Sequence, residues 1–164
     1  MEVIYPALEG VQANIVSNVV GNLGVMALDS DTKYKRPSSV IDREQRFPDL
    51  RGPEKEPLES KGALNFNTPN AHNKKEGWFI VWRYIIDSQH ELDGARTVKI
   101  FRVDVAYLLE DDWKYLDRGP KSQRTPNTVI QASGMKKFQS PYLDPRVTRK
   151  GRGFVIIKPD EKLS

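Results

Sequence analysis

The N-terminal part of the chain carries a helical pattern of apolar residues. Apolar side chains recur at spacings of three and four along residues 6–27, at Leu8, Val11, Ile15, Val19, Leu23 and Met26. These spacings place them on one face of an α-helix. Pro6 suits a first helical turn, and the run Asp29-Ser30-Asp31 is expected to end the helix.

The middle of the chain predicts a two-stranded hairpin. Residues 77–87 form an almost continuous apolar run, rich in aromatic and β-branched side chains, which predicts a central strand covered on both faces. A turn over 88–95 leads to a partner strand over 97–106. Arg83 and Arg102 interrupt these strands, where they are expected to pair with acids at the edge of the sheet or to reach a phosphate. Shorter elements are predicted at 40–41 (strand), 107–113 (short helix or turn), 128–138 (strand and short helix) and 153–157 (last strand).

Composition narrows the classes of protein to consider. A chain of 164 residues and 18.7 kDa predicts a single domain. It has no cysteine, which excludes disulfides and thiolate metal sites, and its two histidines, His72 and His90, argue against a histidine-rich zinc site. No apolar run is as long as a membrane span, and the N-terminus lacks a signal-peptide pattern, so we expect a cytoplasmic protein that does not enter a membrane.

Charge is distributed unevenly along the chain. Residues 1–113 carry 14 Lys/Arg against 18 Asp/Glu, a net of −4, whereas residues 114–164 carry 12 against 4, a net of +8. An acidic part that holds cations and a basic part that holds phosphates suit an enzyme acting on nucleic acid. The alternative is a basic C-terminal segment that serves only solubility.

The candidate chemistry lies between Phe47 and Leu64. Side chains two residues apart in a strand share a face, so Glu59 and Lys61 are expected to project together. A turn at Gly52-Pro53 would bring Asp49 beside them. Two adjacent carboxylates favour a hard cation such as Mg²⁺, with Mn²⁺ as an alternative, and a nearby lysine can assist a metal-bound water. The competing interpretation is an exposed ion pair between Glu59 and Lys61, which would stabilise the fold very little.

These residues resemble the P-D…(D/E)-x-K signature of the restriction-endonuclease-like nuclease superfamily. The segments 77–84, 102–108 and 112–113 add to the resemblance, which covers roughly residues 40–147. Two features depart from the pattern: Ser60 stands where the family often has an apolar residue, and Pro53 and Pro57 leave little room for a strand before Glu59.

The resemblance implies an α/β (α+β) fold with a central mixed β-sheet flanked by helices. It also implies catalytic roles for Asp49, Glu59 and Lys61, with metal held by Asp49, Glu59 and the main-chain carbonyl of Ser60. In such folds the opening helix often supplies a further acid, for which Glu9 is the candidate. Glu9 could equally be a solvated first-turn residue that complements the helix dipole.

The basic part from about residue 114 is the predicted DNA-contacting surface. Its candidate DNA-binding residues are Lys114, Arg118, Lys121, Ser122, Arg124, Thr125, Asn127, Lys136 and Lys137. Guanidinium, ammonium, hydroxyl and amide groups are those that contact phosphates and base edges. The leading hypothesis is therefore a Mg²⁺-dependent endonuclease of the type II restriction kind, acting on double-stranded DNA as a homodimer. Three alternatives stay open: a repair or junction-resolving nuclease, a nucleic-acid-binding protein without catalysis, and an unrelated protein-interaction module.

Overall fold

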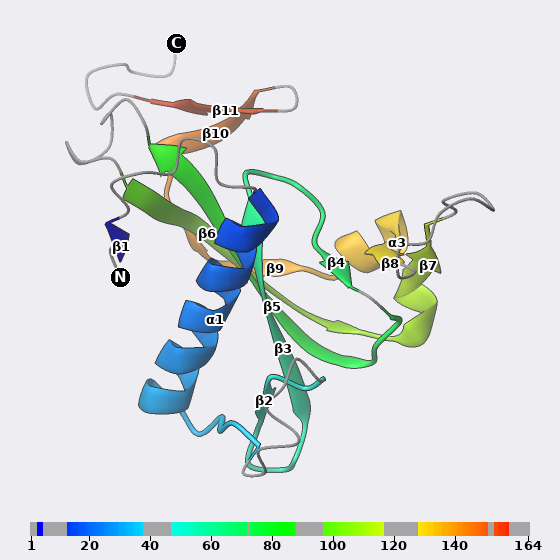
Figure 1. Ribbon diagram of the computed structural model, residues 1–164. Helices are drawn as coiled ribbons and strands as arrows, with labels where there is room; N and C mark the ends of the chain where they lie inside the picture. Colours follow the sequence, from blue (N-terminus) through cyan, green and yellow to red (C-terminus); the bar gives the residue numbers. More distant parts are fainter. Residues whose placement is uncertain are drawn as a thin grey trace.

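The computed structural model describes residues 3–4, 13–37, 47–71, 73–87, 97–116, 128–150 and 153–157 (Figure 1). Within these ranges the protein is an α+β structure. One long helix, α1, lies on a mixed β-sheet, and a smaller three-stranded sheet and a two-stranded hairpin accompany it.

Helix α1 spans Ala13–Asp31. The predicted helix is confirmed from residue 13, and residues 6–12 lie outside the described part. The helix ends at Asp31, so the prediction that Asp29-Ser30-Asp31 would end it is confirmed, although the helix continues four residues beyond the predicted bound at residue 27. Thr32 closes the last turn through bonds from its amide and hydroxyl to the Leu28 carbonyl, 3.0 and 2.6 Å long. Burial of apolar residues along α1, including Val25 near its end, overrides the weak local helix preference there.

The main sheet has six strands. They are β1 (Val3–Ile4), β2 (Leu50–Arg51), β3 (Pro57–Leu64), β5 (Gly77–Asp87), β6 (Thr97–Leu108) and β9 (Gln139–Leu143). The order is β1-β6-β5-β3-β2, and β9 also pairs with β6. Strands β3 and β5 run parallel while the other pairs are antiparallel, so the sheet is mixed, as expected. The predicted central strand is confirmed as β5, and its partner β6 extends two residues beyond the predicted end at residue 106.

Two smaller β-units complete the described structure. A three-stranded sheet joins β4 (Asn70–Ala71), β8 (Thr128–Ile130) and β7 (Trp113–Tyr115), and two short helical turns accompany it, η1 (Glu110–Asp112) and α3 (Ala132–Met135). The strand β10 (Val147–Lys150) forms a hairpin with β11 (Gly153–Ile156). The short elements predicted at 107–113, 128–138 and 153–157 are thereby confirmed, whereas 40–41 lies outside the described residues.

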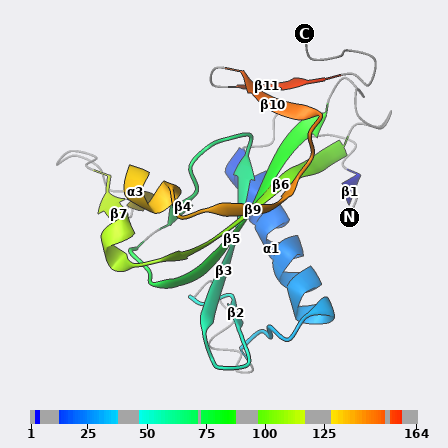
Figure 2. The ribbon, with the colours of Figure 1, turned by 180° about the vertical axis from the view of Figure 1, so that it is seen from behind.

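The two faces of the main sheet are covered differently (Figures 1 and 2). Helix α1 covers one face, where Ile80 and Tyr84 of β5 pack with apolar residues of the helix and of β3. On the opposite face, Phe79 packs against the three-stranded sheet, and Ile85 packs against the β10–β11 hairpin. In the described part of the chain α1 is the one long helix, and it lies on one face of the sheet. The predicted α+β class with a mixed sheet is therefore confirmed, whereas the finer arrangement of several helices flanking the sheet is not.

A buried ionic cluster lies on the second face, at the centre of the sheet. The fully buried carboxylate of Asp104 accepts hydrogen bonds from the Nε atoms of Arg83 and Arg102, both at 2.5 Å, and from the Ser140 hydroxyl at 2.6 Å. Arg83 also donates to the Asn67 carbonyl at 2.8 Å. The two arginines that interrupt the apolar strands therefore pair with an acid.

Candidate active site

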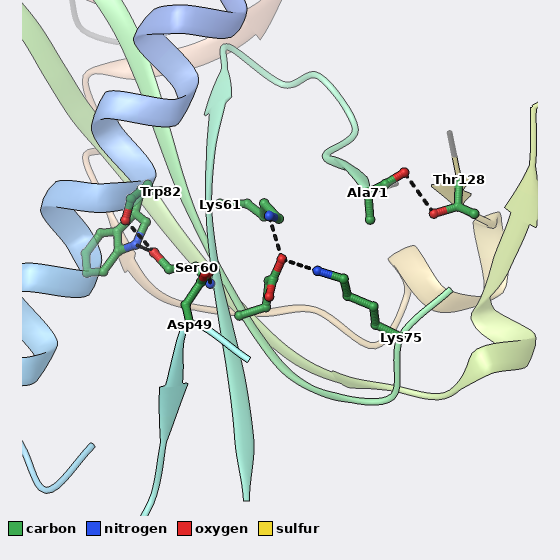
Figure 3. A network of polar contacts seen from close by, with 9 residues as sticks. Asp49, Ser60, Lys61, Ala71, Lys75, Trp82 and Thr128 are labelled. Atoms are coloured by element: carbon green, nitrogen blue, oxygen red, sulfur yellow. Dashed lines mark hydrogen bonds and ion pairs between the residues drawn. The ribbon is translucent and has the colours of Figure 1, made fainter. Parts of the chain in front are cut away.

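A hairpin brings Asp49 to the strand that carries the other site residues. Strands β2 and β3 pair with Leu50 opposite Leu58, and the turn between them is closed by a 3.0 Å bond from the Gly52 amide to the Glu56 carbonyl. Asp49 precedes β2, and its Oδ2 accepts the Ser60 amide proton at 2.8 Å (Figure 3). The predicted approach of Asp49 to the Glu59–Lys61 segment is therefore present, although β3 begins only two residues before Glu59.

Glu59 and Lys61 share one face of β3. The Lys61 Nζ lies 2.5 Å from the Glu59 Oε1. The Glu59 side chain is 2% exposed and that of Lys61 31%. The interpretation of this pair as an exposed ion pair is wrong, because the Glu59 carboxylate is buried. It lies on the same face of the sheet as Phe79 and Val81 of the neighbouring strand. Removing such a carboxylate from water is costly unless ion pairs and hydrogen bonds to both of its oxygens offset the loss of hydration.

The sequence did not single out Lys75, which is a further member of this cluster. Its Nζ lies 2.6 Å from the same Oε1 of Glu59, and its side chain is 17% exposed (Figure 3). The Lys75 carbonyl accepts the Trp113 indole proton at 2.8 Å, and its ammonium lies 5.0 Å from the ring centroid of Phe47. No spacing rule connects Lys75 with Glu59, because the parallel crossover from β3 to β5 brings the two residues together.

The two oxygens of the Glu59 carboxylate have different surroundings. Both lysines approach Oε1 of Glu59, whereas Oε2 is buried and has no hydrogen-bond partner among the described residues. Burial, followed by repulsion from Glu59, raises the pKa of the Asp49 carboxyl, although the Ser60 amide and the lysines act in the opposite direction. A divalent cation at this point would offset both effects, since it would ligate the open oxygen and neutralise the repulsion.

The residues present fit a hard divalent cation with few protein ligands. Among the described residues no group of three or more His, Cys, Asp or Glu side chains converges. The carboxylates of Asp49 and Glu59 are close enough for their charges to repel, and the Ser60 amide donates to Asp49. The Ser60 carbonyl oxygen lies against α1, 3.3 Å from where a Cβ on Gly21 would stand. This donor set suits Mg²⁺, which keeps several of its waters. Glu9, the candidate for an additional acid, lies outside the described residues.

Ser60 itself points to the opposite side of β3, toward α1. Its buried hydroxyl donates to the Gly21 carbonyl at 2.8 Å and accepts the Trp82 indole proton at 2.9 Å (Figure 3). Glycines allow this close contact, since a Cβ on Gly62 would lie 2.2 Å from the Ser17 carbonyl oxygen and one on Gly24 would lie 2.1 Å from the Trp82 Nε1. The buried Ser60 hydroxyl is accommodated at this position because the Gly21 carbonyl and the Trp82 indole both bond to it.

The structure describes only some of the predicted DNA-contacting residues. Lys114 on β7 and Lys136 after α3 are exposed, and both belong to the unit built around the three-stranded sheet. Lys137 pairs with Asp112 at 2.6 Å. Asp112 ends the acidic run Glu110-Asp111-Asp112, yet it is buried and accepts the Leu109 amide proton at 2.8 Å. Burial opposes the lowering of the Asp112 pKa, but the Leu109 amide and Lys137 outweigh it.

The other predicted DNA-contacting residues lie outside the described part of the chain: Arg118, Lys121, Ser122, Arg124, Thr125 and Asn127. The same is true of His72 and His90. No described helix has both the length and the apolar character needed to cross a membrane.

Comparisons with protein-family models, with curated proteins and with solved structures gave no match to this chain. The geometry of the cluster formed by Asp49, Glu59, Lys61 and Lys75 is therefore the basis for inferring a function.

Proposed function

We propose that the protein is a Mg²⁺-dependent deoxyribonuclease that hydrolyses phosphodiester bonds, most simply a type II restriction-like endonuclease. The observation that carries the proposal is the buried Glu59 Oε2, which has no hydrogen-bond partner in the part of the chain that the structure describes and lies in a cluster with a second carboxylate, Asp49, and with Lys61. A stable fold has no need for an unpaired buried carboxylate oxygen. A cation site gives that oxygen a ligand, and Mn²⁺ would satisfy the same donors.

Each site residue has a distinct part in this proposal. Asp49 and Glu59 would hold the cation, with the Ser60 carbonyl as a further donor. When bound, Mg²⁺ lowers the pKa of its water and withdraws charge from a phosphate. The Lys61 ammonium, which is partly exposed, would orient the attacking water and stabilise charge that develops on the phosphate. The β2–β3 hairpin fixes these groups on regular structure, as precise positioning requires.

Double-stranded DNA is the proposed substrate, held by the basic part that includes Lys114 and Lys136. A small nuclease that cuts both strands at a symmetric site is expected to act as a homodimer. Repair and junction-resolving nucleases use the same chemistry, and the fragments produced distinguish them from a restriction enzyme.

Plasmid cleavage tests the proposal directly. The protein is incubated with supercoiled plasmid and mixed genomic DNA in Mg²⁺, in parallel with EDTA and with Lys61→Ala. We expect cleavage that EDTA abolishes and that Lys61→Ala reduces by about 10²-fold or more. Lys55→Asn is the matched control, because it removes a lysine from the tip of the same hairpin and because Asn tolerates the positive φ of 65° found there.

The outcomes separate the candidate functions. Discrete fragments indicate a sequence-specific endonuclease, and smearing that EDTA and Lys61→Ala abolish indicates a nonspecific one. DNA retardation that survives EDTA, without any cleavage across the genomic mixture, would refute the nuclease and favour a binding protein without catalysis.

A further inference from the structure

Lys75 places a second ammonium group on the Glu59 carboxylate, beside that of Lys61. Lys61 already lies 2.5 Å from Oε1, so a single ion pair is complete without Lys75. Lys75 nevertheless approaches the same oxygen to 2.6 Å, from a separate segment of the chain. Together, Asp49, Glu59, Lys61 and Lys75 carry formal charges that cancel. The cluster is therefore electrically balanced by lysines in the absence of a metal ion.

Adding a divalent cation would upset this balance. A cation held by Asp49 and Glu59 neutralises both carboxylates, which leaves two ammonium groups with no counter-charge beside a dication. Lys61 is fixed to the same strand as Glu59, two residues away. Lys75 lies on the segment before β5, where the Trp113 indole bonds to its carbonyl, and its side chain reaches Glu59 from a part of the chain separate from β3.

We propose that Lys75 is a second functional lysine of this site: through Oε1 it balances the charge of Glu59 while no divalent cation is bound and, once a cation is bound at Oε2, its ammonium group pairs with a phosphate of the DNA. This inference rests on the proposed nuclease function. It predicts competition between Lys75 and the metal ion for Glu59, and a contribution of Lys75 to phosphate binding. A lysine with a purely structural role would produce neither effect.

Mg²⁺ titration calorimetry on the full chain tests the competition. Lys75→Ala should bind Mg²⁺ more tightly than the unsubstituted protein, by roughly fivefold or more, since coupled sites commonly show effects of that size. At saturating Mg²⁺ the same variant should cleave plasmid DNA about tenfold more slowly. Tighter metal binding with slower cleavage is the expected signature.

Matched variants keep the test decisive. Lys74→Ala is the control, because it removes the neighbouring lysine, whose ammonium lies 5.8 Å from the Tyr115 ring centroid rather than on Glu59. Lys75→Gln keeps most of the side chain and replaces Lys75→Ala if thermal unfolding shows that the alanine variant is not folded. Lys75→Arg, which keeps the charge, should retain more cleavage activity than Lys75→Gln.

Two results would overturn the inference in different ways. If the unsubstituted protein binds Mg²⁺ and cleaves DNA while both neutral Lys75 variants match Lys74→Ala in affinity and rate, the inference alone fails. If the unsubstituted protein neither binds Mg²⁺ nor cleaves DNA, the proposed function fails and the inference fails with it.

Discussion

The Ser60 hydroxyl provides a quantitative test of how the site strand is held. Ser60→Ala removes one oxygen that links β3 to two elements: the Gly21 carbonyl of α1 at 2.8 Å and the Trp82 indole of β5 at 2.9 Å. The substitution changes neither Glu59 nor Lys61, which point to the other face. We expect it to weaken the fold while leaving the site side chains in place.

The magnitude follows from the two hydrogen bonds. Each contributes about 1 kcal/mol net, so their loss should lower the free energy of unfolding by about 2 kcal/mol. The helical carbonyl of Gly21 keeps its partner within α1, whereas the Trp82 Nε1 loses its partner. The indole nitrogen lies so close to Gly24 that it cannot turn toward the helix. For a chain of this length, about 2 kcal/mol lowers Tm by roughly 6 °C.

A double-mutant cycle with Trp82→Phe isolates the bond between these side chains. Phenylalanine keeps most of the ring packing but lacks the indole N–H. Urea unfolding of the two single variants and the double variant should show a coupling of about 1 kcal/mol, because the second substitution has no bond left to break. Additive effects, within about 0.5 kcal/mol, would refute the assigned role of the Ser60 hydroxyl.

The remaining predictions concern Asp49, which is partly buried, and Asp104, which is fully buried. Because the pKa of Asp49 is raised in the fold, its ionised form is disfavoured, and stability should fall as pH rises from the ordinary carboxyl range through the raised pKa. Asp49→Asn, which keeps an acceptor for the Ser60 amide, should therefore raise Tm at neutral pH in EDTA and flatten the Tm profile between about pH 4 and 8; a lower Tm at neutral pH would contradict this reasoning. Asp104→Ala leaves Arg83 buried without its partner and should cost about 3–5 kcal/mol in urea unfolding. The double variant Asp104→Leu/Arg83→Met should recover most of that loss, and failure to recover would show that the cluster stabilises more than its own charges.

Much of the local structure could be predicted from the sequence. The apolar run at 77–87 specified the central strand, because only a strand with both faces covered accepts so many β-branched and aromatic residues. The two-residue spacing of Glu59 and Lys61 specified their shared face, and Gly52-Pro53 specified the turn that brings Asp49 to β3.

The remaining features depend on tertiary contacts that no local pattern contains. Lys75 reaches Glu59 only through the parallel crossover, and Asp112 is buried only because Lys137 and the Leu109 amide meet it. The end of α1 was misplaced because Gly21 and Gly24 look like helix-weakening residues in the sequence. In the fold they are the positions at which the helix approaches β3 and Trp82 most closely.

Gly62 affects the register of β3 as well as its packing against α1. A Cβ at this position would lie 2.2 Å from the Ser17 carbonyl oxygen, so only glycine fits where β3 passes under α1. If β3 slipped by one residue, Lys61 or Ala63 would meet the helix backbone and Glu59 would turn toward the helix. Gly62 therefore fixes the register of β3 relative to α1. A residue without a side chain keeps Glu59 and Lys61, rather than their neighbours, on the face of β3 opposite α1.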